Sequence, residues 1–198
     1  MSDPAPYLGT RWYDSDASDF NALHFVIRQF LATIANSAIV QVVAVYGTGL
    51  NPTGTVDVLP LVNQVDGRGN PTPHGIVPGL PFFRLQGGTN AVVIDPVVGD
   101  IGLAVFADRD VSTVKATRAQ ANPGSFRQHD MADGFYLGGF LNGVPTQYVQ
   151  FTSGGIDIVS SGTVAITSVG LTHNGVNIGS THEHGGVQTG TGNTGVPH

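Results

Sequence analysis

Two histidines near the end of the chain, His182 and His184, have the type and spacing that most clearly suggest chemistry. They are two positions apart, and in an extended chain such residues point to one side. Val176 and Ile178 share that parity, so the pattern predicts that two imidazoles continue the apolar face of a strand. Burying imidazoles without partners costs free energy, and a metal ion would supply the partner. Glu183 has the opposite parity and is not expected to be a ligand.

The segment around this pair, residues 171 to 198, reads LTHNGVNIGSTHEHGGVQTGTGNTGVPH. It resembles the C-terminal tip of the baseplate central spike proteins of contractile-tailed bacteriophages, a family of membrane-puncturing spikes. In that family a His-x-His pair from each of three chains holds an iron ion on the threefold axis, and His182 and His184 occupy the matching positions. The resemblance therefore implies one iron ion per homotrimer. Six imidazoles also suit an octahedral first-row metal, whereas structural zinc is almost always four-coordinate.

The composition is typical of a strand-rich protein that buries surface against copies of itself. Charged residues make up 11% of the 198 residues, well below the roughly 25% of ordinary domains. The net charge of −6 disfavours nucleic acid as a partner. No lysine or arginine follows Arg127, so a mixed front half is followed by a nearly uncharged back half. The chain has no cysteine, which excludes disulfides and thiolate metal sites.

The first part of the chain, residues 1 to 37, is expected to form an irregular arm followed by one helix. Ser18 or Asp19 is a plausible N-cap for it. Apolar residues then recur at helical spacing: Phe20, Leu23, Ile27, Phe30, Leu31 and Ile34. We expect this face to pack on a core, and a docking face for the hub above a spike is the alternative.

Residues 38 to 115 contain about five short strands separated by turns, and this pattern fits a small Greek-key barrel of the OB type. The segment PVVGDIGLAVFADRD also resembles the last strand of the OB domain in the spike family. OB-folds often bind oligonucleotides through basic and aromatic residues. The expected strands carry little positive charge beyond Arg84 and Arg109, so we predict a structural adaptor that binds no nucleic acid.

The back half is predicted to be a linker at 116 to 135, a β-helix at 136 to 170 and an apex at 171 to 198. The middle part has short apolar runs between Gly, Ser and Thr. Four apolar residues share one parity: Ile156, Ile158, Val164 and Ile166. One short chain cannot bury such a face, whereas three copies wound around an axis can. The pattern resembles the intertwined triple-stranded β-helix of phage spikes.

Other chemistries fit the sequence less well. His129 lies beside Asp130 and Asp133, but this spacing matches no established ligand motif. Cupin metal enzymes also use a His-x-His pair, yet they need a glutamate shortly after it, and no Glu follows His184. A glycan hydrolase needs two carboxylates in a cleft, and the back half has few acids. A disordered tail that contains histidines is the remaining alternative.

The sequence thus predicts an all-β homotrimer with one N-terminal helix, an OB-fold domain, a triple-stranded intertwined β-helix and a metal-capped apex. The resemblance implies a mechanical, non-enzymatic role. The protein would lie at the tip of a virion tail baseplate, bind the baseplate hub or tail tube protein, and pierce the host outer membrane when the sheath contracts. The tip protein of a related injection machine, such as a tailocin or a type VI-like system, is the second interpretation. A cupin-like metal enzyme is an alternative from a different class.

Overall fold

The computed structural model describes residues 14–32, 34, 36–66, 68–183 and 190. The chain divides into two compact units, Met1–Gly143 and Val144–His198, which are considered separately below. Most of the regular structure is β, and α1 (Asp19–Ala32) is the one long helix of the described residues, so the all-β prediction is confirmed. No helix in the described ranges is long and apolar enough to cross a membrane.

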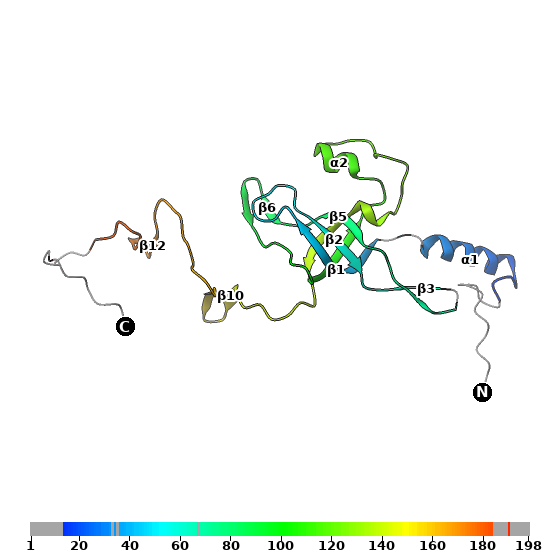
Figure 1. The fold of residues 1–198 in the computed structure, drawn as a ribbon, viewed down its shortest axis with the longest axis horizontal. Helices are drawn as coiled ribbons and strands as arrows, with labels where there is room; N and C mark the ends of the chain where they lie inside the picture. The colour runs from blue at the N-terminus through cyan, green and yellow to red at the C-terminus, as the bar shows by residue number, and fades with distance from the viewer. Residues whose placement is uncertain (1–13, 33, 35, 67, 184–189, 191–198) are drawn as a thin grey trace, which may run out of the picture. The chain divides into compact units, whose positions relative to one another are not determined.

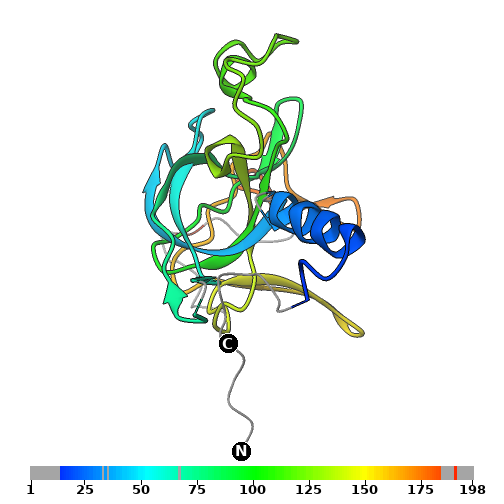
Figure 2. The same ribbon diagram turned by 90° about the vertical axis from the view of Figure 1, so that its right-hand side faces the viewer.

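The first unit is built on a curled antiparallel sheet in the order β5-β2-β1-β8-β9 (Figures 1 and 2). Its strands are β1 (Ser37–Tyr46), β2 (Thr55–Pro60), β5 (Val77–Pro81), β8 (Ile101–Phe106) and β9 (Gly134–Gly139). The two ends of the sheet meet just beyond β5, where Phe82 forms a parallel bridge with Tyr136. The Phe83 N–H donates to the Tyr136 carbonyl over 2.7 Å. The curled sheet therefore closes at this point.

The inner face of this sheet holds the core. Burial alternates strictly along β2 and β8, as expected for strands with one face inward. The buried hydrophobic residues are Val40, Val42, Val56, Val58, Val77, Leu80, Ala104, Phe106 and Tyr136. Gly134 lies so close to this core that a β-carbon there would collide with Leu80 and Phe106. A side chain at this position would therefore separate β9 from the core.

Two small hairpins extend from the same unit. One pairs β3 (Gln64–Val65) with β4 (Pro71–Thr72), and the other pairs β6 (Leu85–Gly87) with β7 (Asn90–Val92). These short strands carry no buried residues. They are therefore loops that extend from the curled sheet rather than parts of its core.

Helix α1 forms where the helical spacing predicts it, but its packing differs from our expectation. None of its residues is buried in the single chain. Its exposed large apolar residues are Phe20, Leu23, Val26, Ile27, Phe30 and Leu31. The spacing of apolar residues correctly predicted a one-sided helix, but that pattern does not specify whether the same chain or another one covers the face.

The segment between β8 and β9 is mostly exposed from residue 116 to 128, as expected for the solvated linker at 116 to 135, but the end of this range joins the sheet of the first unit. It carries the short helix α2 (Ser112–Thr117) and the 3-10 turn η1 (Met131–Asp133). The strand that follows, β9, pairs with β8 although we had assigned residue 136 onwards to the β-helix. The physical reason is Tyr136, which is buried in the core of the first unit. The compact unit accordingly extends to Gly143.

An ionic cluster holds this segment against the sheet. Arg127 donates from Nε and Nη2 to the two carboxylate oxygens of Asp133, each over 2.8 Å. Asp133 is 1% exposed and also accepts the Val111 N–H. The guanidinium is 3.5 Å from Asp110, which accepts the Ser125 hydroxyl over 2.6 Å. Hydrogen bonds from Ser112 and Ser125 lower the pKa of Asp110, and those from Arg127 lower the pKa of Asp133, so both carboxyl groups are charged at neutral pH.

Arg127→Ala is expected to destabilise the first unit by about 3 kcal/mol, because it leaves the buried Asp133 carboxylate without its partner. The folded-state pKa of Asp133 is lowered, so its stabilisation is present above the unfolded Asp pKa of about 3.9 and is lost as pH falls below it. Urea unfolding at neutral pH and near pH 3 would measure both effects.

Arg68→Ala, in an exposed turn, is the control. An unchanged unfolding midpoint in Arg127→Ala would contradict this role.

Candidate metal-binding apex

The second unit begins with a hairpin that has one apolar face. Strand β10 (Tyr148–Thr152) pairs with β11 (Gly155–Val159), and the register sets Val149 opposite Ile158 and Phe151 opposite Ile156. Residues directly opposite each other project to the same side of a sheet, so these four side chains share one face. Their exposed fractions are 60%, 65%, 77% and 58%. The hairpin thus presents a compact apolar surface to solvent.

No residue between 144 and 183 is buried in the single chain, and only Gly179 is even half-buried. Beyond the hairpin, further large apolar side chains are exposed: Val164, Ile166, Val169, Leu171, Val176 and Ile178. Burial of apolar surface is the main favourable term in folding. A unit without a core of its own therefore needs a covering surface from elsewhere, and contiguous exposed apolar surface commonly marks an interface.

The apex begins with a second hairpin at the predicted turn. Strand β12 (Thr172–His173) pairs with β13 (Val176–Asn177), and Asn174 and Gly175 connect them with φ angles of 50° and 83°. Two successive positive φ angles are typical of a type I′ turn, which favours Asn-Gly. The Asn-Gly turn prediction is confirmed. The Ile178 N–H donates to the Leu171 carbonyl over 2.9 Å and extends the pairing by one step.

After Ile178 the chain turns, which corrects the extended run expected from Val176 to His184. The Asn177 side chain accepts the Gly179 N–H over 2.8 Å and donates to the Thr181 hydroxyl over 3.0 Å. The His182 N–H then donates to the Gly179 carbonyl over 3.1 Å. Asn side chains stabilise such local turns in competition with strand pairing. The alternation of side chains that begins at Val176 is interrupted by this turn, so it does not determine to which side the His182 side chain points.

The His182 ring has a defined hydrogen bond within this turn. Its Nδ1 is 2.6 Å from the Gly179 carbonyl oxygen. A carbonyl oxygen only accepts, so Nδ1 is the donor, and a neutral imidazole in this tautomer has its lone pair on Nε2. Metal-ligating histidines generally donate their second nitrogen to a carbonyl or carboxylate in this way. His182 therefore fits a metal ligand that binds through Nε2, whereas His184 lies outside the described residues.

The sequence matches no protein-family model, and a search of curated proteins finds no match. Within the described part of a single chain, no three His, Cys, Asp or Glu side chains lie close enough together to hold a metal ion. Glu183 is exposed, and it belongs to no such group of potential ligands within the described residues. A complete ligand set at the apex would therefore include residues of further chains or residues beyond those described.

The other histidine considered from the sequence, His129, is in a different environment. Its Nδ1 is 3.6 Å from the Asp108 carboxylate, a residue 21 positions earlier that spacing rules did not suggest. Asp133 is engaged by Arg127, and Asp130 accepts the Ala132 N–H over 2.8 Å. The carboxylates near His129 in sequence thus have structural partners. This geometry supports neither a metal site nor an acid–base pair among these residues.

Proposed function

We propose that the protein is the homotrimeric central spike of a contractile tail baseplate, located at the tip of the virion tail, which pierces the host outer membrane when the sheath contracts. The observation that carries the proposal is the second unit. Between residues 144 and 183 it has defined hairpins and exposed apolar faces but no buried residue. Three intertwined copies would give these faces a common core, as in a triple-stranded β-helix.

The connectivity of the first unit supports an OB-type barrel as the N-terminal domain of the spike. The strands β1, β2 and β5 form a meander, β8 returns to pair with β1, and β9 pairs with β8. The parallel bridge from Phe82 to Tyr136 then joins the third long strand to the fifth. A closed five-stranded Greek-key arrangement of this kind is typical of OB-folds. In this proposal the barrel is an adaptor that joins the spike to the hub or tail tube protein.

The apex would be closed by an iron ion held by His182 and His184 from each of the three chains. The Nδ1 contact of His182 with the Gly179 carbonyl supports its assignment as a ligand through Nε2. Imidazole suits iron and other first-row metals in octahedral sites. A bound ion would tie three chain ends into one rigid point, which is what a piercing tip requires.

A tip protein of a related injection machine, such as a tailocin or a type VI-like system, fits the same features and is the second candidate. A cupin-like metal enzyme is disfavoured because catalytic metal sites usually take three protein ligands and one open position. The described residues of one chain do not bring three such ligands together.

Antibody labelling of particles from the source cells tests the proposed location. We expect electron microscopy to show label at the tip of contractile particles, at the end of the tail that carries the baseplate. Antibody raised against residues 1 to 143 and blocked with the same fragment is the control for specificity. Label on the sheath, on the capsid or only on soluble material would contradict the spike assignment.

A further inference from the structure

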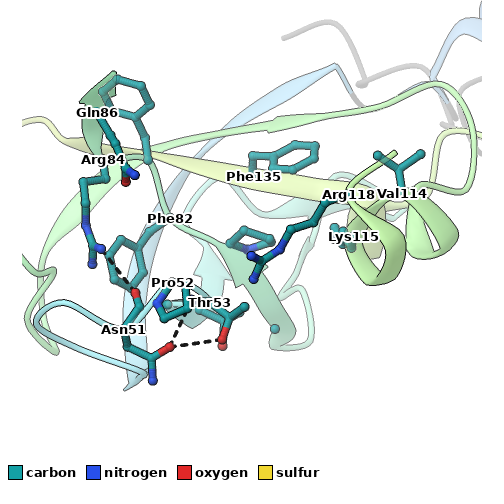
Figure 3. A pocket seen from close by; sticks show the side chains of 15 residues that line it. Asn51, Pro52, Thr53, Phe82, Arg84, Gln86, Val114, Lys115, Arg118 and Phe135 are labelled. Carbon is teal, nitrogen blue, oxygen red and sulfur yellow. Dashed lines mark hydrogen bonds between the residues drawn. The ribbon is translucent and has the colours of Figure 1, made fainter. Parts of the chain in front are cut away.

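A pocket in the first unit has a chemistry of its own (Figure 3). Its volume is about 780 Å³, within the range of ligand sites. Four segments far apart in the sequence line it: residues 51 to 55, the end of β5 with the residues that follow it, helix α2 with Arg118 at its end, and Phe135 of β9. Sequence spacing did not suggest this site because its walls come together only when the barrel closes.

The pocket concentrates positive charge in an acidic protein. Three of the eight lysines and arginines line it, namely Arg84, Lys115 and Arg118, and none of the described residues that line it is an aspartate or glutamate. The chain as a whole has a net charge of −6. Clustered charge of one sign in a concave wall attracts ligands of the opposite sign. The pocket therefore favours an anion.

Two of the cations are fixed in place by the backbone. Arg84 donates to the carbonyls of Gly49 over 2.7 Å and Asn51 over 3.2 Å, and Figure 3 shows the latter bond. The Lys115 ammonium donates to the Ala132 carbonyl over 3.1 Å, and burial lowers its pKa. The backbone contacts hold both groups at the wall without adding negative charge, whereas the Asp95 carboxylate, 3.7 Å from Arg84, forms an ion pair with that guanidinium.

Arg118 is the third cation and differs from the other two. It ends α2 in the left-handed conformation with φ 54°, and its exposed side chain points into the pocket region in Figure 3. In the part of the chain that the structure describes, no hydrogen bond or ion pair engages its guanidinium. An arginine held at a pocket without a carboxylate partner is available for a bidentate contact with a ligand carboxylate.

The aromatic rings of the pocket support the cations rather than form open stacking platforms. The Arg84 guanidinium lies 5.8 Å from the centroid of the Phe82 ring, and the Lys115 ammonium lies 5.3 Å from that of Phe135. The Phe82 ring also covers Gly54, where a β-carbon would collide with it. Binding of a single strand of nucleic acid relies on free ring faces and on a longer basic groove. A short ligand with few negative charges fits better.

We propose that this pocket binds an acidic peptide segment of a partner protein, with its carboxylates on Arg118 and Lys115 and an apolar side chain against Phe83 and Val114. Phe83 is 58% exposed and Val114 44% exposed, so both offer apolar contact. The pocket belongs to the first unit alone, so the proposal does not depend on the trimer or on the metal. In OB-type barrels the loops at this place also bind oligonucleotides, which makes single-stranded DNA the competing ligand.

Fluorescence polarisation at low salt, with the full-length protein, tests the proposal. The probe is a short labelled peptide of glutamate and leucine, and its matched control has glutamine in place of glutamate. We expect the acidic peptide to bind about tenfold more tightly than the glutamine peptide, since charge-assisted hydrogen bonds are lost in the control. Added salt should weaken the binding of the acidic peptide.

Arg118→Asn should weaken binding of the acidic peptide by about tenfold. Asparagine tolerates the left-handed backbone at this position, so the fold should be retained. Arg118→Lys should retain part of the affinity, and Arg68→Asn, which removes the same charge outside the pocket, should change nothing. Equal binding of the two peptides, an unaffected Arg118→Asn variant, or tighter binding of labelled oligothymidine than of the acidic peptide would each overturn the proposal.

Discussion

The double change Ile156→Asp with Ile158→Asp is expected to abolish the proposed trimer. Both side chains lie on the apolar face of the β10–β11 hairpin, and in a trimer six carboxylates would enter the common core. Burial of one isoleucine contributes about 1.5–3 kcal/mol, and an unpaired carboxylate in its place adds a larger penalty. We expect monomers by sedimentation velocity at micromolar concentration, with the first unit still folded.

The matched control places the same charge outside that face. Gln150→Asp with Thr152→Asp adds two aspartates on the opposite face of the hairpin, because both positions alternate with Val149 and Phe151 along β10. An aspartate at 152 can accept the Gly154 N–H as the Thr152 hydroxyl does, so the turn should be retained. The control should remain trimeric. A trimer that survives the isoleucine changes would show that this face does not form the interface.

Replacement of both His182 and His184 with alanine is expected to remove the proposed apical iron ion completely. His182 holds the geometry of a ligand through Nε2, and the paired position His184 would supply the second imidazole of each chain. Loss of two imidazoles per chain eliminates all six proposed ligands. Elemental analysis of purified protein should find iron in the wild type and none in the variant. His173→Ala, on strand β12, removes a nearby histidine and should keep the metal.

Two outcomes of this experiment would contradict the proposed apex. Equal metal content in wild type and double variant would show that the ion lies elsewhere. Zinc at one ion per chain would favour an enzyme-like site, because zinc sites built from few protein ligands keep an open position for chemistry. The apolar faces of the hairpin do not depend on the imidazoles, so the double variant should still sediment as a trimer.

Local signals in the sequence predicted the features that depend on local physics. The apolar spacing from Phe20 to Leu31 predicted a helix, and Asn174-Gly175 predicted the turn that the φ angles display. Alternating strands with β-branched residues predicted an all-β chain. Each of these signals acts between residues that are close in sequence, so the sequence alone is sufficient to predict the feature.

Features that depend on contacts distant in sequence were not predictable in the same way. The strand β9 is short and rich in glycine, and only its pairing with β8 and the burial of Tyr136 assign it to the barrel. The pairing of Arg127 with Asp133 likewise follows from the fold of a segment that looks like a polar linker. At the apex, the Asn177 side chain redirects the chain before His182, and parity counting does not include such a side-chain bond.

The central claim is that three chains share one core and one apical ion. Sedimentation equilibrium of the wild-type protein, with metal analysis of the same sample, tests it most directly. We predict a single species of three chains that contains one iron ion and does not dissociate on dilution. A well-folded monomer at micromolar concentration, or one metal ion for every chain, would contradict the account.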